Sequence, residues 1–148
     1  MSGATASRPA VDRPGLRARR LALLALFESE FGIASAVDAL DRLGRERSAT
    51  TSVAEHAARI VAGVLAERAA LDLEIARLAP AIPVTELGKV ERTILRSALW
   101  EMLYSAATPV GETVNDAVSL ARIYAGDAAR RLVNGVLGSV SRSSGAGD

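Results

Sequence analysis

Arginine is the residue type whose spacing in this sequence most clearly points to a chemistry. Arg13, Arg17 and Arg20 recur at roughly helical spacing, so several of them could line one side of a helix and its lead-in. Guanidinium groups can donate two parallel hydrogen bonds to phosphate oxygens, so such a row could hold a phosphate backbone. The first twenty residues carry five arginines and one acid, a local excess of four positive charges: Arg8, Arg13, Arg17, Arg19 and Arg20 against Asp12.

The charge of the whole chain does not by itself indicate a polyanionic partner. The sequence has 18 Lys plus Arg and 17 Asp plus Glu, for a net charge of +1. Only the uneven distribution of the arginines favours binding to phosphates. An alternative is that the arginine-rich end only keeps the chain soluble.

The sequence contains no recognisable catalytic or metal-binding pattern. It has no cysteine, which excludes disulfides and thiolate sites and fits a reducing, cytoplasmic setting. The single histidine, His56, has no second histidine or patterned acid pair nearby, so we expect a half-exposed helix residue and no metal. No phosphate-binding glycine loop or nucleophile motif occurs, and we expect neither a cofactor nor an enzyme.

Length and composition favour one all-α domain. The 148 residues are 49% hydrophobic but only 3% aromatic, so the core must consist of Ala, Leu, Val and Ile. No segment alternates with period two for long enough to predict a sheet. The apolar run from Leu21 to Phe27 is interrupted by Glu28 and Glu30, well short of the roughly twenty residues that cross a bilayer.

Apolar periodicity and capping residues predict seven helices. The first runs from Gly15 or Leu16 to Phe31 and ends at Gly32. Four later helices have start signals, namely Ser35, Ser52 with Glu55 as a capping box, Thr85 or Gly88, and Thr108-Pro109. Another helix carries Leu71, Ile75 and Leu78, and the last begins near Asp127 and ends at Val140.

The same periodicity predicts which side chains face the core. Those that we expect to be buried include Val37, Leu65, Leu99, Leu103 and Ile123. We expect residues 1–14 to form a disordered basic arm, 15–140 the folded domain and 141–148 a disordered tail.

Several separate motifs resemble the NusB family of transcription antitermination factors. They are Val90-Glu91-Arg92, Ile94-Leu95-Arg96, Leu99-Trp100-Glu101, Val114-Asn115-Asp116-Ala117 and Val133-Asn134-Gly135-Val136-Leu137. Upstream, Arg17-Ala18-Arg19-Arg20 followed by Leu26-Phe27 resembles the opening helix of that family. The resemblance covers about nine tenths of the chain and implies a helical bundle of about seven helices, packed as two sub-bundles. Gly135, a small residue within a motif, is expected to permit a close helix approach.

The resemblance implies an RNA-binding protein without catalytic activity. In the family, NusB pairs with NusE, a small-subunit ribosomal protein, and the pair binds the boxA element of nascent ribosomal RNA transcripts. The complex joins the RNA polymerase elongation complex and suppresses premature termination. Some members self-associate, so a homodimer is compatible with the resemblance.

The resemblance also assigns candidate site residues beyond the first arginines. Phe27 stands where the family pattern has an aromatic residue, so it could stack on a splayed base, and core packing is the equal alternative. Arg130 and Arg131, at the start of the last helix, would lie beside the RNA. The sequence departs from the pattern at Leu132, where an aromatic residue is common, and at Ala128, where an acid is frequent.

The partner protein would dock on the carboxyl-terminal helices, where Glu91, Arg96 and Glu101 are candidate contacts. The alternative is that Arg92, Arg96 and Glu101 form ordinary ion pairs within one helix. Two other functions compete with antitermination. A domain of this fold opens ribosomal RNA cytosine methyltransferases, which need a catalytic domain and a cysteine that this sequence lacks. The other is a non-catalytic helical scaffold or dimerisation module that does not bind RNA.

Overall fold

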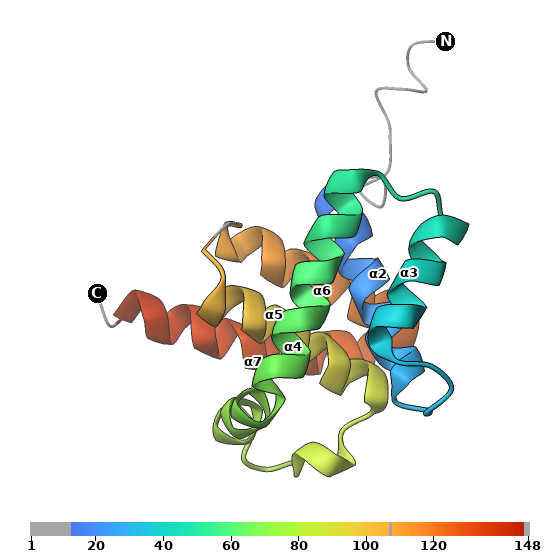
Figure 1. The fold of residues 1–148 in the computed structure, drawn as a ribbon. Helices are drawn as coiled ribbons and strands as arrows, with labels where there is room; N and C mark the ends of the chain where they lie inside the picture. The colour runs from blue at the N-terminus through green and yellow to red at the C-terminus, as the bar shows by residue number, and fades with distance from the viewer. Residues whose placement is uncertain (1–12, 107, 147–148) are drawn as a thin grey trace.

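The computed structural model describes residues 13–106 and 108–146. Within these ranges the chain forms six α-helices and one 3-10 turn, and it forms no strand (Figure 1). The elements are α2 (Pro14–Ser29), α3 (Ala36–Glu46), α4 (Thr51–Leu78), η2 (Val84–Glu86), α5 (Lys89–Tyr104), α6 (Val110–Ala125) and α7 (Asp127–Ala146). The expected all-α class is confirmed. Residues 1–12, most of the expected arm, lie outside the described ranges, and α7 continues past Val140, where we expected it to end.

Local sequence signals explain where several helices begin. Pro14 occupies the first turn of α2, a position where its missing N–H costs no helical hydrogen bond. The Ser35 side chain accepts a hydrogen bond from the Asp38 N–H, which confirms the predicted cap of α3. The cap of α4 predicted at Ser52 is wrong by two residues, because Thr50 is the capping residue and accepts from the Val53 N–H.

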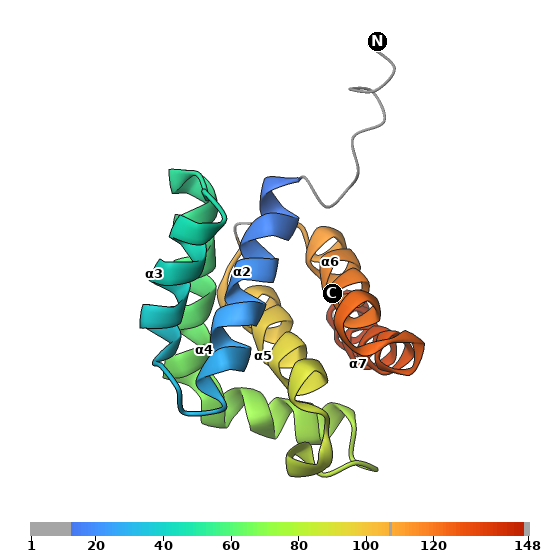
Figure 2. The ribbon, with the colours of Figure 1, turned by 90° about the vertical axis from the view of Figure 1, so that its right-hand side faces the viewer.

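Two of the predicted helices are one continuous element. Helix α4 runs from Thr51 to Leu78 and has a single non-helical residue, Glu67, with φ −111° and ψ 18°. The helix bends sharply in its second half, as both ribbon views show (Figure 2). This merger accounts for the difference between the expected seven helices and the six described.

Helices α2 and α5 form the centre of the bundle. Helix α2 packs against α3, α4, α5 and α6, whereas α5 packs against α2, α4, α6 and α7. In Figure 2, α2 runs down the front of the molecule, with α3 on its left and α6 and α7 on its right. The molecule therefore has an amino-terminal group, α2 to α4, and a carboxyl-terminal group, α5 to α7.

Leucine, alanine, valine and isoleucine fill the core, as the composition predicts. Leu95, Leu99 and Leu137 are fully buried at the centre. Four residues that we expected to be buried are exposed instead: Val37, Leu65, Leu103 and Ile123. Each lies beside the buried stripe of its helix; Leu65, for example, is rotated by about 100° from the buried Val64.

No helix in the described ranges is both long and apolar enough to cross a membrane.

Candidate nucleic-acid interface

Helix α2 has one partly exposed side, and this side carries three of the residues predicted to bind RNA. Eight of its sixteen residues are buried, from Leu16 to Leu26, because α2 has neighbours on several sides. The partly exposed positions include Arg17, Arg20, Leu24 and Phe27, which are three or four residues apart and so share one side of the helix. We call these four residues the α2 stripe.

The two arginines of the stripe are available to a ligand. Neither Arg17 nor Arg20 forms an ion pair or hydrogen bond with any other described residue, and both are partly exposed. The Nε atom of Arg20 is buried without a partner in the described chain. Two cations without a carboxylate partner, side by side on a partly apolar surface, are suited to binding phosphate oxygens.

Phe27 lies between the two expected environments. Its side chain is partly buried, and its ring meets Phe31 edge to face, with 5.1 Å between the ring centroids and 73° between the planes. Its ring is therefore partly covered by Phe31 and also contributes to the surface of the stripe.

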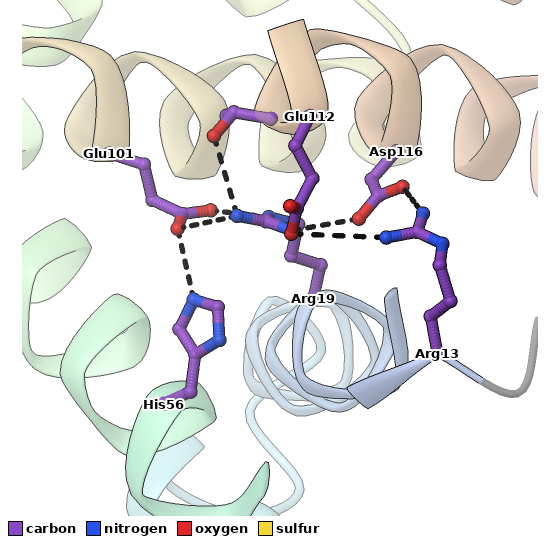
Figure 3. A network of polar contacts seen from close by, with 7 residues as sticks. Arg13, Arg19, His56, Glu101, Glu112 and Asp116 are labelled. Carbon is purple, nitrogen blue, oxygen red and sulfur yellow. Dashed lines mark hydrogen bonds and ion pairs between the residues drawn. The ribbon is translucent and has the colours of Figure 1, made fainter. Parts of the chain in front are cut away.

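Arg19, a third predicted RNA contact, points into the protein instead. Its side chain is only 5% exposed and bonds groups on α5 and α6 (Figure 3). The Nε atom donates to Glu101 at 2.8 Å, and Nη1 donates to Asp116 at 2.7 Å and Glu112 at 3.0 Å. Nη2 donates to the second Glu101 oxygen at 3.1 Å. In this conformation the Arg19 guanidinium is fully occupied by the protein.

Arg13 and His56 complete this cluster from opposite sides. Arg13 donates to the second oxygen of Asp116, and its side chain is 43% exposed. His56, on α4, lies with Nε2 3.0 Å from the Glu101 carboxylate, so it has a polar partner that sequence reasoning did not assign. Figure 3 shows how these side chains converge from α2, α4, α5 and α6. We call Arg13, Arg19, His56, Glu101, Glu112 and Asp116 the Arg19 cluster.

The pKa of the Glu101 carboxyl group is lowered, because its hydrogen bonds and charged neighbours outweigh the effect of burial. Burial alone would raise the pKa of this carboxyl group, since it disfavours the charged form. Hydrogen bonds from His56 and Arg19 favour the carboxylate and lower its pKa below the ordinary value of 4.5. Glu101 is therefore an internal charge held by α2 and α4, although we expected it to contact a partner protein.

A second cluster surrounds Glu30, the capping residue that follows α2. Its carboxylate accepts hydrogen bonds from Arg92 at 2.7 Å and Arg68 at 3.1 Å, and it lies 3.6 Å from Arg96. Arg96 is 5% exposed and donates two hydrogen bonds to Asp72 on α4, at 2.7 and 2.9 Å. Arg96 thus joins α5 to α4 and to the end of α2, and it is not on the outer surface. We call these five residues the Glu30 cluster.

The remaining candidates are at the surface. Arg130 and Arg131 both pair with Asp127 at the start of α7, and their side chains are 34% and 64% exposed. Glu91 is partly exposed at the start of α5. The structure therefore leaves Arg17, Arg20, Phe27, Arg130 and Arg131 at the surface, whereas Arg19, Arg96 and Glu101 are internal.

Sequence reasoning missed the acidic partners of these arginines. A helical projection contains part of the signal: six residues after Arg13, Arg19 falls about 120° away from the line of Arg13, Arg17 and Arg20. That angle puts it beside the buried leucines of α2. No local pattern indicates that Glu101 and Asp116, 82 and 97 residues later, accept its hydrogen bonds.

Comparison with known proteins identifies the class and then the family. The fold is that of the helical antitermination factors: a NusB structure from T. maritima superposes with a TM-score of 0.81 at 26% identity, covering 88% of this chain and 92% of that one. A structure of antitermination factors NusB and NusE in complex with double-stranded RNA gives a TM-score of 0.80 at 24% identity, covering 89% and 98%. Transcription antitermination protein NusB of Dehalococcoides mccartyi is 35% identical over 127 residues, 86% of this chain and 89% of the relative.

The model of the NusB family matches residues 16–142, so the chain belongs to the NusB family. It is a non-catalytic transcription antitermination factor, as the resemblance of its motifs predicted. Several residues of the matched motifs have structural roles. The Arg19 cluster contains Glu101 and Asp116, and the Glu30 cluster contains Arg92 and Arg96.

Proposed function

We propose that this protein binds boxA-type RNA in nascent ribosomal RNA transcripts through the α2 stripe and the start of α7. The observation that carries the proposal is the pair of unpartnered arginines, Arg17 and Arg20, in line with the Phe27 ring. Phosphate contacts supply affinity without sequence preference. A base stacked on an aromatic ring is held in place, and hydrogen bonds to its edges then recognise the sequence. A NusB structure of the same fold was solved with NusE and RNA, which supports this class of ligand.

The other predicted RNA contacts have different roles in this proposal. Arg13, at the head of the stripe, keeps part of its guanidinium exposed and can approach a phosphate while it holds Asp116. Arg19 positions the stripe by tying α2 to α5 and α6, and does not touch RNA. Arg130 and Arg131 provide a second basic position, on α7.

We also propose that NusE and the RNA polymerase elongation complex are the protein partners. Glu91, at the surface near the start of α5, is the proposed contact for NusE. Arg96 and Glu101 contribute indirectly, because they hold α5 against α4 and α2. The homodimer that the family resemblance allows can be tested on the same samples by sedimentation equilibrium.

Salt dependence of RNA binding tests the phosphate contacts. For Arg17→Ala/Arg20→Ala we expect weaker binding and a salt slope smaller by about 1.4, since each contact to a single strand contributes about 0.7. Arg130→Ala/Arg131→Ala should reduce the slope by a similar amount. Binding is measured by equilibrium titration against boxA-like and scrambled RNA at several ionic strengths.

A matched control separates local contacts from net charge. Ala69→Glu/Ala76→Glu changes the net charge by the same two units on exposed positions of the second half of α4. If it reduces the slope as much as Arg17→Ala/Arg20→Ala, the effect is one of net charge and the stripe is not the site. Equal affinity of the wild type for boxA-like and scrambled RNA would favour the scaffold alternative.

The NusE contact is tested by adding that protein to the titration. We expect the affinity of the wild type for boxA-like RNA to rise in its presence. Glu91→Lys should reduce this rise and leave binding to RNA alone no weaker, because the substitution adds positive charge. If RNA affinity of the Glu91→Lys variant rises on addition of NusE as much as that of the wild type, Glu91 does not belong to the proposed interface.

A further inference from the structure

Phe31 is a large aromatic side chain that the core does not use. It follows the carboxyl-terminal end of α2 and is 55% exposed, in a turn where Gly32 has φ +72°. Exposed aromatic rings with a defined neighbour are typical of binding surfaces, where they provide a large contact area at low entropic cost. The ring of Phe31 is held in place by its edge-to-face contact with Phe27.

A cation lies beside this ring. The Nζ atom of Lys89, the first residue of α5, is 5.8 Å from the centroid of the Phe31 ring, within the range of a cation–π contact. Lys89 forms no ion pair with any carboxylate in the described part of the chain. An exposed ring and a free ammonium group are the two elements that hold one nucleotide of a single strand, the ring through its base and the cation through its phosphate.

The acidic residues at this end of α2 are already neutralised. Glu28 pairs with Arg42 of α3, and Glu30 is enclosed by Arg92 and Arg68. These carboxylates therefore present little repulsion to a phosphate beside Lys89. Glu28 and Glu30, which flank Ser29 in the sequence, therefore add little net negative charge to this surface.

Phe31 also continues the spacing of the α2 stripe. The positions 17, 20, 24, 27 and 31 are separated by three or four residues, and the contact of the two rings shows that the line extends past the last helical turn. From Arg17 to Phe27 the helix rises about 15 Å, so a strand bound along the stripe reaches the Phe27 ring and then the Phe31 ring.

We propose that Phe31 and Lys89 form a further nucleotide-binding position for single-stranded RNA, in which a base stacks on the Phe31 ring and Lys89 binds its phosphate. The inference rests on the proposed RNA-binding function of the α2 stripe. A protein partner is the other class of ligand for an exposed aromatic residue. RNA is favoured because the ring lies in line with unpaired arginines and next to an unpaired lysine.

The test measures stacking and affinity in the same titration. RNAs carry 2-aminopurine at successive positions, and quenching of its fluorescence reports the base that stacks. Phe31→Leu keeps an apolar side chain but removes the ring, and we expect about tenfold weaker binding, about 1.4 kcal/mol, with loss of quenching at one position. Phe31→Tyr should retain both, and Lys89→Ala should reduce the salt slope by about 0.7.

Ile33→Ala is the matched control, because Ile33 is 79% exposed in the same connection and has no ring. If Phe31→Leu binds RNA as tightly as Ile33→Ala and retains the quenching, the proposal is overturned. It is equally overturned if Phe31→Leu weakens binding to NusE and leaves RNA affinity unchanged. Arg17→Ala/Arg20→Ala, measured alongside, distinguishes this failure from failure of the α2 stripe, because it tests RNA binding independently of Phe31.

Discussion

Two arginines on α2, two residues apart, have opposite environments. Arg17 is partly exposed and has no carboxylate partner among the described residues, whereas Arg19 is 5% exposed and bonds three carboxylates. The free energy of a buried ion pair depends on its partners, because an unpaired charge in the interior costs several kcal/mol. The planar guanidinium of Arg19 can satisfy carboxylates in several directions, which a lysine could not do. A position two residues from a proposed RNA contact can thus have a role in the fold alone.

Substitution of these two arginines should separate stability from RNA binding. Arg19→Ala leaves Glu101 and Asp116 buried without their main partner, so we expect the free energy of unfolding to fall by about 3 to 5 kcal/mol. Arg17→Ala should change it by less than about 0.5 kcal/mol and should weaken RNA binding. Urea unfolding followed by circular dichroism measures both variants. Equal stability of the two would mean that the Arg19 cluster does not hold α2 in place.

At the scale of elements, the crossing of α4 and α5 depends on a glycine. At Gly63, a side chain would begin within 2.0 Å of the Trp100 ring, so the indole lies directly against the α4 backbone. By contrast, nothing within 4 Å would meet a side chain at Gly135, so the close approach that we expected there is wrong. The fit of Trp100 is one of the contacts that set the distance between the two helices.

Gly63→Ala should therefore force α4 and α5 apart and reduce the free energy of unfolding by about 1 to 3 kcal/mol. Trp100→Leu removes the clash, so the double variant should lose less than the sum of the single losses in a double-mutant cycle. Gly44→Ala is the control: nothing lies within 4 Å of the added carbon, and alanine is the better helix former. If the two losses in the free energy of unfolding simply add, Trp100 does not clash with the carbon added at position 63.

The sequence predicts the elements better than their contacts. Capping and periodicity placed the start of α3 at Ser35 and the buried Leu99 correctly, because both depend on neighbours in the chain. The break expected before Leu71 was wrong, because α4 continues with only a local distortion at Glu67. Arg19 was expected to bind RNA, and its inward direction, although consistent with its angle on α2, was not predicted. Its partners on α5 and α6 could not be predicted, because pairs so distant in sequence leave no local pattern.

At the scale of the whole molecule, the two ion-pair clusters fix α2 at both ends. The Arg19 cluster joins the first half of α2 to α4, α5 and α6, and the Glu30 cluster joins its end to α4 and α5. The aliphatic core provides most of the burial, but these charges determine which side of α2 faces outward. The orientation of the proposed RNA-binding surface therefore depends on carboxylates that lie beneath it.

Acid should weaken this attachment. Burial would raise the pKa of Glu30 and of Glu101, but Arg92, Arg68 and Arg96 lower the first, and His56 and Arg19 lower the second, below the ordinary 4.5. A carboxyl group whose pKa is lower in the folded state stabilises the fold above its unfolded pKa, and this contribution is lost as the pH falls through the folded pKa.

We therefore expect the free energy of unfolding to decrease as the pH drops below about 4.5, measured by urea unfolding at a series of pH values. Glu101→Gln should be less stable at neutral pH and should lose less on acidification, because its titrating group is gone. Glu55→Gln removes an exposed carboxylate that has no ion pair in the described chain, and its curve should follow the wild type. Glu101→Gln could instead lose as much stability as the wild type between neutral pH and pH 3. In that case other carboxyl groups hold the amino-terminal helices against the carboxyl-terminal helices, and the orientation of α2 does not depend on the Arg19 cluster.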